Sequence, residues 1–249
     1  MRSVVVSLSL ILLVPFTSLG QLNQEQFSRR GDILPDGTKP NVSFDLTKTV
    51  RNWAGTDGLG CCVMASARNN SIYLGMPDVG ETIYRVSSSK EGGHWHEKFL
   101  SQMREVEQVH PGLKYWSDPS ADYDELVAFS EKGLPIGITI GTGARYNMQI
   151  ISHMVSAVKI GRDNELSAIC DNNFPNEIAA MPTPIFKQRI AINSPTGKPW
   201  ATIIFPMRKI KPDDDQDCEN NNIEMPMFFC LCIVVSTWTW VIANRLFIR

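Results

Sequence analysis

The sequence predicts an α+β domain in which a helical half packs on an antiparallel β-sheet. Three helix patterns precede residue 135 and five strand patterns follow it, so the two kinds of element are segregated along the chain. Two apolar segments at the ends of the chain are expected to lie outside this domain. The chain is therefore predicted to consist of one folded body between two targeting segments.

The helices are expected over residues 61–75, 97–109 and 120–133. The first follows a glycine-rich loop, Gly55 to Gly60, and its small and apolar residues suit a buried helix. The second carries apolar side chains at three- and four-residue steps. The third begins at Ser120 as its N-cap and ends at Gly133. The last two helices are expected to act as scaffold.

The strands are expected over residues 136–140, 150–160, 166–170, 188–192 and 201–205. These segments are rich in residues that favour a pleated, half-buried surface. The stretch from Ser194 to Gly197 is expected to turn the last two strands against each other. Residues 21–49 are polar and rich in glycine, proline and aspartate, so they predict an extended lead-in, with the fold beginning near Val50.

The N-terminus has the features of a signal peptide over residues 1–20. One positive charge, at Arg2, precedes an apolar run from Val4 to Phe16 that is too short to span a bilayer. Ser18 and Gly20 are the small residues that a signal peptidase accepts directly before its cut. The chain is therefore predicted to enter the secretory pathway.

The C-terminal segment is predicted to form a single transmembrane helix over residues 225–244. It is apolar and uncharged almost throughout, and two tryptophans lie toward one end. The arginines of residues 245–249 form a predicted cytoplasmic stub, while the acidic residues 209–224 form a solvated stalk. The domain over residues 50–208 is then lumenal or extracellular.

The charge and the local motifs restrict the partners. A formal net charge of −2 without a basic patch argues against a nucleic-acid partner. The triplets that begin at Asn41 and Asn69 match the N-glycosylation pattern, which matters only where the host glycosylates that compartment. The membrane is an expected partner, and the oligomeric state is left open.

Three positions in chain order suggest nucleophilic catalysis. Cys62 follows the glycine-rich loop, where a helix N-terminus and an imidazolium would lower the pKa of its thiol. His153, near the start of a strand, is expected to act as base and acid. Asp171 or Asn172 follows the next strand and would fix the imidazole tautomer, because neighbouring strands lie about 5 Å apart.

This arrangement resembles the papain-like cysteine peptidases over about residues 50–206, and among them the compact bacteriocin-processing branch. The resemblance is carried by Gly60-Cys61-Cys62-Val63-Met64-Ala65-Ser66, His153-Met154-Val155 and Asp171-Asn172-Asn173-Phe174-Pro175. It implies a papain-like fold, a Cys–His–Asp/Asn triad, a peptide or protein substrate, and no cofactor. The family usually places a glutamine ahead of the nucleophile, whereas this chain has Thr56 and Asp57 there, so Asn52 is the candidate oxyanion donor.

Other interpretations of the same residues stay open. Cys61 could be the nucleophile in place of Cys62, although the resemblance favours Cys62. In an oxidising compartment four cysteines could instead form two structural disulfides: Cys61, Cys62, Cys170 and Cys218. A metal site at His94, His96 and Glu97 lacks a further well-spaced ligand, so no metal is expected.

The sequence thus predicts a membrane-anchored cysteine hydrolase, in particular a peptidase, with the loop from Gly141 to Tyr146 lining its cleft. The alternative is a catalytically inactive ectodomain of the same fold, displayed for binding, which the missing glutamine favours. A viral origin fits either function. A reactive thiol at Cys62 would support the enzyme, and a disulfide there would support the binding module. Whether residues 21–49 form an inhibitory pro-segment is not decided by the sequence.

Overall fold

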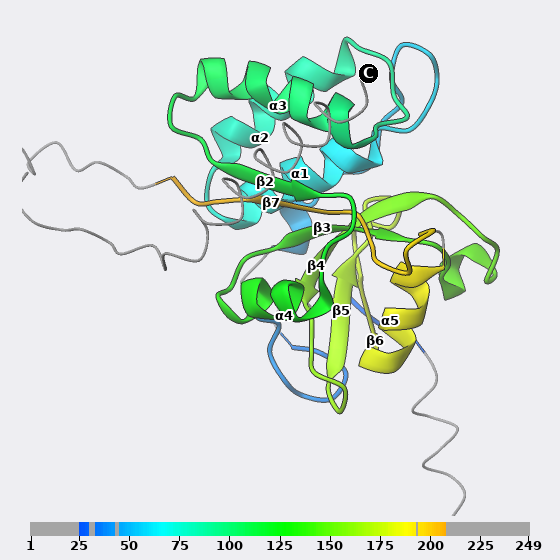
Figure 1. The fold of residues 1–249 in the computed structure, drawn as a ribbon. Coiled ribbons are helices and arrows are strands. Elements are labelled where there is room, and N and C mark those ends of the chain that lie inside the picture. The colour runs from blue at the N-terminus through cyan, green and yellow to red at the C-terminus, as the bar shows by residue number, and fades with distance from the viewer. Residues whose placement is uncertain (1–24, 30–32, 43–44, 193, 208–249) are drawn as a thin grey trace, which may run out of the picture. The chain divides into compact units, whose positions relative to one another are not determined.

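The computed structural model describes residues 25–29, 33–42, 45–192 and 194–207 (Figure 1). The predicted signal peptide, stalk, transmembrane helix and cytoplasmic stub lie outside these residues. Among the residues that the structure describes, no helix is long and apolar enough to cross a membrane. The topology at the two ends of the chain therefore stays a prediction.

The described residues form an α+β fold with an antiparallel sheet, as the sequence predicts, but the sheet has seven strands where five are expected. The strands are β1 (Gln26–Ser28), β2 (Tyr115–Asp118), β3 (Ile136–Ile140), β4 (His153–Lys159), β5 (Leu166–Cys170), β6 (Ile178–Pro182) and β7 (Ala201–Ile204). Their order in the sheet is β1-β6-β5-β4-β3-β7-β2. The α-helices are α1 (Cys62–Tyr73), α2 (Pro77–Ser88), α3 (His96–Val109), α4 (Tyr123–Glu131) and α5 (Thr183–Ala191). Two short 3-10 helices are η1 (Leu46–Lys48) and η2 (Ala144–Tyr146).

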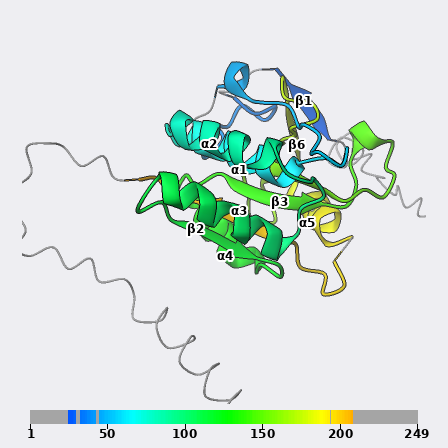
Figure 2. The same cartoon turned by 90° about the horizontal axis from the view of Figure 1, so that it is seen from above.

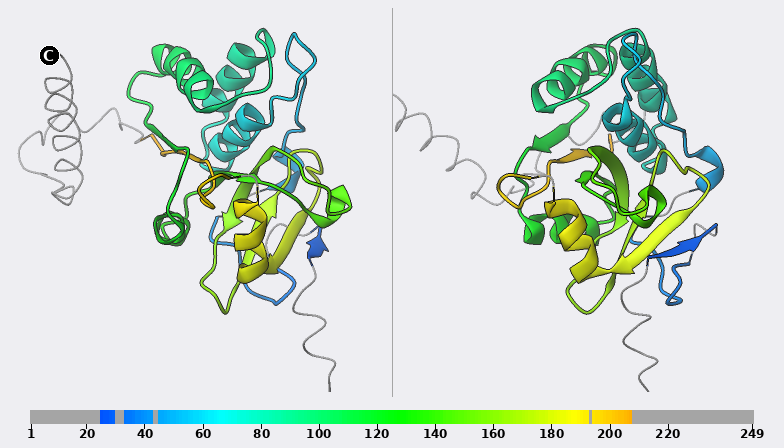
Figure 3. Two further views of the ribbon diagram at one scale, coloured as in Figure 1. Left: turned by 45° about the vertical axis from the view of Figure 1, so that its right-hand side comes forward. Right: turned by 90° about the vertical axis from the view of Figure 1, so that its right-hand side faces the viewer.

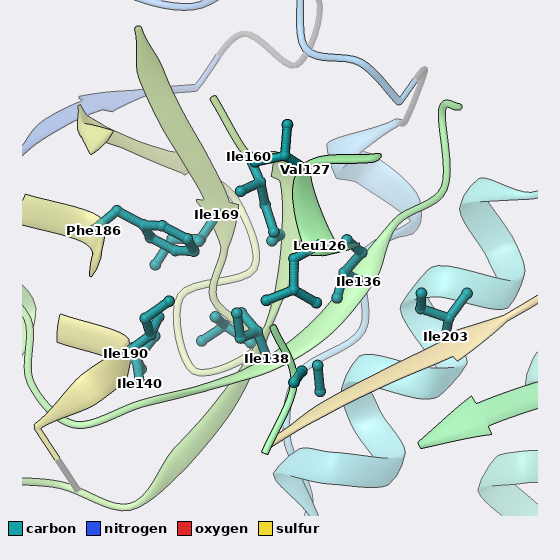
Figure 4. Close-up of a cluster of buried hydrophobic side chains, with 14 of the residues drawn as sticks. Leu126, Val127, Ile136, Ile138, Ile140, Ile160, Ile169, Phe186, Ile190 and Ile203 are labelled. Atoms are coloured by element: carbon teal, nitrogen blue, oxygen red, sulfur yellow. The ribbon is translucent and has the colours of Figure 1, made fainter. Parts of the chain in front are cut away.

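Helices cover both faces of the sheet (Figures 1 and 2). α1, α2 and α3 gather on one face around a buried cluster that includes Phe99, Met103 and Met154. α4 and α5 pack on the other face, where Leu126 and Phe186 belong to a second cluster (Figure 4). In both views of Figure 3, α5 lies against the sheet and apart from the three helices of the first face. The elements that carry Cys62 and His153, α1 and β4, are therefore packed by two buried clusters, one on each face of the sheet.

One predicted strand is wrong. Residues 188–192 form the end of α5 and its C-cap, because Phe186 and Ile190 lie one helical turn apart and are both buried. The turn predicted from Ser194 to Gly197 does form, with Gly197 N donating to Ser194 O at 3.1 Å. It joins α5 to β7, however, and not two strands to each other.

Residues before Val50 contribute to the fold. β1 pairs with the edge of β6, and three apolar side chains of the lead-in, Leu34, Val42 and Leu46, are buried. They form a third cluster with residues of β4, β5 and β6. The lead-in predicted over residues 21–49 is thus, in its described part, packed against the sheet.

The two glycosylation triplets differ in their setting. Asn69 lies in α1 with no exposed surface, and its side chain bonds the N–H and the C=O of Val50 at 2.8 and 3.2 Å. A glycan on Asn69 would therefore not fit this folded domain. Asn41 is partly exposed and donates to Ser130 Oγ at 3.1 Å, while Ser43 of its triplet lies outside the described residues.

Candidate active site

Cys62 is the first residue of α1, and the loop of residues 53–61, closed by backbone hydrogen bonds, directly precedes it. Within this loop Cys61 N donates to Trp53 O at 2.8 Å, and Gly55 N donates to Leu59 O at 2.8 Å. The N–H groups at the start of a helix have no partner within the helix, and they carry the positive end of its dipole. A thiol at this position is therefore placed where a negative charge is stabilised.

A second glycine pair holds this loop from outside. Gly93 N donates to Gly60 O at 3.0 Å. A Cβ atom on Gly92 would lie 2.1 Å from Leu59 O, so only glycine allows the two backbones to come this close. Asp57, which occupies the region of the expected glutamine, accepts from Gly92 N at 2.8 Å. Asp57 thus joins the two loops.

His153 begins β4 and lies against Asp171, which directly follows β5. Its Nε2 atom is 2.8 Å from Asp171 Oδ1, and the two residues are only 6% and 7% exposed. Because Asp171 accepts from Nε2, the other ring nitrogen, Nδ1, is left for the thiol of Cys62. The structure thus brings together all three members of the predicted triad.

The electrostatics of this trio favour a charged pair. Burial alone would lower the pKa of His153, but hydrogen bonds with Asp171 and Cys62 and the charges of both raise it to about 9. Burial would raise the pKa of the Cys62 thiol, but the hydrogen bond and the charge of His153 lower it, together with backbone N–H groups of Met154 and Val63. The arrangement therefore stabilises a thiolate beside an imidazolium.

The two adjacent cysteines have opposite environments. Cys61 has no exposed surface, and burial, with the charges of Cys62 and Asp57, raises the pKa of its thiol to about 11. Cys62 is partly exposed and faces His153. The described cysteines, Cys61, Cys62 and Cys170, are all free thiols, whereas Cys218 lies outside the described residues. Of the two thiols, Cys62 is therefore the one whose surroundings favour the thiolate.

Of the two proposed orienting residues, Asp171 and not Asn172 contacts His153. The amide nitrogen of Asn172 donates to Cys62 O at 3.1 Å, to Ser66 Oγ at 2.9 Å and to Met154 O at 2.9 Å. Asn172 has no exposed surface. Its position corrects the expectation that it could orient the imidazole: it fixes the first turn of α1 to β4.

Asn52, the oxyanion candidate, lies beside the nucleophile loop. Its Nδ2 atom is 3.1 Å from the position that a Cβ atom on Gly60 would take, and it donates to Asn173 Oδ1 at 3.2 Å. An amide nitrogen carries two hydrogens, so one donor remains beyond the bond to Asn173. Asn52 lines the same cleft as Cys62 and His153.

The cleft at the trio has a volume of about 780 Å³. Apolar side chains on its wall include Leu59, Trp95, Ile151 and Trp200. Of the loop from Gly141 to Tyr146, which is expected to line the cleft, only Tyr146 is among its described lining residues. No aspartate, glutamate, lysine or arginine is among them. The described wall of the cleft thus combines apolar side chains with uncharged polar ones around the Cys62–His153 pair.

The histidines considered as metal ligands have protein partners. His94 Nε2 lies 3.0 Å from Gln102 Oε1, and His96 Nδ1 lies 2.9 Å from Ser117 Oγ. Within the described part of the chain, no three or more histidine, cysteine, aspartate or glutamate side chains are grouped to hold a metal ion. His94 lines the cleft, and burial lowers its pKa.

The sequence does not single out Tyr146, although the structure places it next to the trio. The hydroxyl of Tyr146 donates to Asp171 Oδ2 at 2.7 Å, directly behind the His153 contact. The sequence places Tyr146 only on a loop expected near the cleft. The bond depends on how residues 141–152 fold, and no pattern of residue types indicates it.

No protein-family model matches the chain, and a search of curated proteins finds no significantly similar sequence. Neither comparison assigns an activity or a ligand to any residue of the cleft. The function is therefore inferred from the geometry and chemistry of the site.

Proposed function

We propose that the chain is a papain-like cysteine hydrolase, in particular a peptidase. Cys62 is its nucleophile, His153 its base and acid, and Asp171 the group that orients His153. One observation carries this proposal: the buried imidazole of His153 lies 2.8 Å from the Asp171 carboxylate and interacts with the Cys62 thiol, which lowers the pKa of that thiol. A structural cysteine needs no such partner.

The proposed reaction needs no cofactor. The thiolate of Cys62 attacks the carbonyl carbon of the scissile amide, and a carbon–sulfur bond forms. As the carbon–nitrogen bond breaks, His153 gives its proton to the leaving amine. Water then attacks the thioester while His153 takes its proton. The carbon–sulfur bond breaks, the carboxylic acid leaves, and the thiolate–imidazolium pair is restored.

The negative oxygen of the tetrahedral intermediate needs hydrogen-bond donors. The backbone N–H of Cys62 lies in the first turn of α1, where such groups have no intrahelical partner. The Asn52 amide, on the wall of the same cleft, is the second candidate. These two groups would replace the glutamine that the family usually provides.

The positions of Cys62, His153 and Asp171 in the helices and strands support the papain-like assignment. The nucleophile begins a helix, α1, that packs on β4, while the base and the orienting carboxylate lie at the ends of β4 and β5. We further propose that residues 225–244 anchor this domain to a membrane, on its lumenal or extracellular side. A peptide or protein segment entering the apolar cleft is the proposed substrate.

The test is iodoacetamide labelling of the full chain between pH 5 and 10, with Cys61 and Cys62 resolved by mass spectrometry. The expected result is fast labelling of Cys62, with an apparent pKa below its ordinary value of 9.0, that is lost in His153→Ala. A mixture of peptides is then incubated with the wild type and with Cys62→Ala. Cleavage by the wild type alone is expected.

Each outcome decides between the two candidate functions. If Cys62 labels no faster than an ordinary thiol, or forms a disulfide, the enzyme is excluded and the ectodomain is a binding module. If Cys62 labels fast but no peptide or small amide is cleaved, the hydrolase is excluded despite its reactive thiol. Cys61→Ala is the matched control, because it removes the neighbouring thiol and should leave the Cys62 profile unchanged.

A further inference from the structure

The two carboxylate oxygens of Asp171 have separate partners. Oδ1 lies 2.8 Å from His153 Nε2 and also accepts from Asn173 N at 2.8 Å. Oδ2 accepts from the hydroxyl of Tyr146 at 2.7 Å. A carboxylate can rotate about its bond to Cβ, and only partners on both oxygens fix the plane in which it meets the imidazole.

The hydroxyl of Tyr146 is itself oriented. Asn173 Nδ2 donates to it at 3.0 Å, so the hydroxyl accepts there and its own hydrogen points to Asp171. Burial and the Asp171 charge raise the pKa of Tyr146 far above its ordinary value, which keeps the phenol protonated as a donor. Asn173 also accepts from Asn52, so one network joins the orienting carboxylate to the oxyanion candidate.

The Tyr146 ring packs against the imidazole ring of His153. Its centroid is 5.8 Å from that of His153 and 5.7 Å from that of Phe174, in edge-to-face contacts. Replacing Tyr146 with phenylalanine would keep these contacts and delete only the hydroxyl. The effect of the hydroxyl can therefore be separated from the packing of the ring.

The loop that carries Tyr146 is held in one conformation. Asn147 and Met148 adopt left-handed backbone angles, φ 51° and 58°, which non-glycine residues rarely adopt without support from their surroundings. Glu25 accepts from Ala144 N at 2.8 Å. The Arg145 guanidinium forms a two-pronged bond with Glu177. Two adjacent residues of the loop are thus bonded to residues that directly precede strands, Glu25 before β1 and Glu177 before β6.

We propose that Tyr146 is a positioning residue: through its hydroxyl bond to Asp171 it holds His153 in line with Cys62. This inference rests on the proposed function, because alignment matters only if the pair is used. It adds to the Cys–His–Asp trio a residue whose hydroxyl acts through Asp171. The left-handed loop and its anchors then serve to place one hydroxyl.

The sign of one pKa change tests this role. If Tyr146 aligns the carboxylate, its removal weakens the Asp171–His153 bond, and the pKa of His153 falls from about 9 toward its ordinary 6.5. If the hydroxyl only neutralised part of the carboxylate charge, its removal would strengthen that charge and raise the pKa of His153. A merely structural hydroxyl would leave the pKa unchanged.

The experiment compares the full-length wild type with Tyr146→Phe and Tyr123→Phe, each labelled with ¹³C at histidine and titrated by nuclear magnetic resonance. The chain has four histidines, and His153→Gln assigns the signal. Tyr123 is the matched control, because its hydroxyl donates to Gly161 O at 2.9 Å in another part of the fold. In Tyr146→Phe we expect a lower His153 pKa and slower alkylation of Cys62 at pH 8, by up to about tenfold.

An unchanged or raised His153 pKa in Tyr146→Phe overturns the proposal. If this variant does not fold, Asn173→Ala replaces it, because losing the bond that orients the hydroxyl should move the His153 pKa in the same direction. A different pair of results would exclude the proposed function while leaving this inference intact. A slow Cys62 in the wild type, together with a lowered His153 pKa in Tyr146→Phe, excludes the enzyme and leaves the positioning contact in place.

Discussion

Replacing Asp171 by asparagine should convert Cys62 from a thiolate to an ordinary thiol. The change keeps the size of the side chain and an oxygen for His153, but it removes the charge that raises the pKa of His153. At pH 8 an imidazole with a pKa of about 9 is about nine-tenths protonated, whereas one at 6.5 is only about 3% protonated. The variant therefore loses most of its imidazolium at this pH.

The consequence for Cys62 follows from its own ordinary pKa of 9.0. A thiol with this pKa is about one-tenth ionised at pH 8. The hydrogen bond and the charge of His153 lower the pKa of Cys62 and so increase its ionised fraction. We therefore expect alkylation of Cys62 at pH 8 to slow in Asp171→Asn, by up to about tenfold, because full ionisation is the limit. The wild-type advantage is present below the pKa of His153 and is lost as the pH rises through about 9.

The assay is the second-order rate of iodoacetamide labelling at Cys62 in the full chain, measured from pH 5 to 10. Asp163→Asn is the matched control, because Asp163 forms an exposed ion pair with Lys187 at 2.6 Å. Asp163 lies in the connection between β4 and β5, at the opposite end of these strands from His153 and Asp171. This variant should reproduce the wild-type profile. A labelling rate for Asp171→Asn within twofold of the wild type at pH 8 would refute the coupling of Asp171 to the thiol.

Three further changes test the scaffold of the site. Gly92→Ala places a Cβ atom 2.1 Å from Leu59 O, so the loop before the nucleophile must move, and Cys62 should label more slowly than in the wild type. Glu25→Ala leaves the Arg189 side chain, 7% exposed, without the partner it now has at 2.6 Å, and should cost about 3–5 kcal/mol in urea unfolding. Phe99→Ala empties a fully buried position on the α1 face and should also cost about 3–5 kcal/mol by the same measurement. A loss below about 1 kcal/mol in either variant would contradict the burial on which these two estimates depend.

The elements that could be predicted from the sequence are those with a strong local signal. α3 carries apolar residues at helical spacing over several turns, and β3 is an isoleucine-rich run that follows a proline. The strand predicted over residues 188–192 covers only the last four residues of α5 and its C-cap, a window too short to separate a period of 2 from one of 3.6. Over the whole helix, buried Phe186, Arg189 and Ile190 fall on one face.

The elements missed altogether depend on partners far along the chain. β6 is rich in alanine, a residue with low preference for strands, and it is held between β1 and β5. β2 has only four residues and pairs with β7, more than eighty residues later. α2 begins at Pro77, two residues after the predicted end of the first helix, because proline suits the first turn of a helix.

The choice between Asp171 and Asn172 shows where prediction of the site stops. In the β4–β5 pair Ser156 lies opposite Cys170, so extending this register places Val155 opposite Asp171 and Met154 opposite Asn172. Side chains alternate between the faces of a strand, and Asp171 therefore shares its face with Val155 and His153.

Asn172 shares the other face with Met154, toward α1, where its amide binds Met154 O. The period of two was available from the sequence, but the register was not, because a bulge between Ala157 and Lys159 shifts it by one residue. A shift of one residue exchanges the two faces. The order Cys, His, Asp/Asn could thus be found from residue types alone, whereas the identity of the orienting group required the fold.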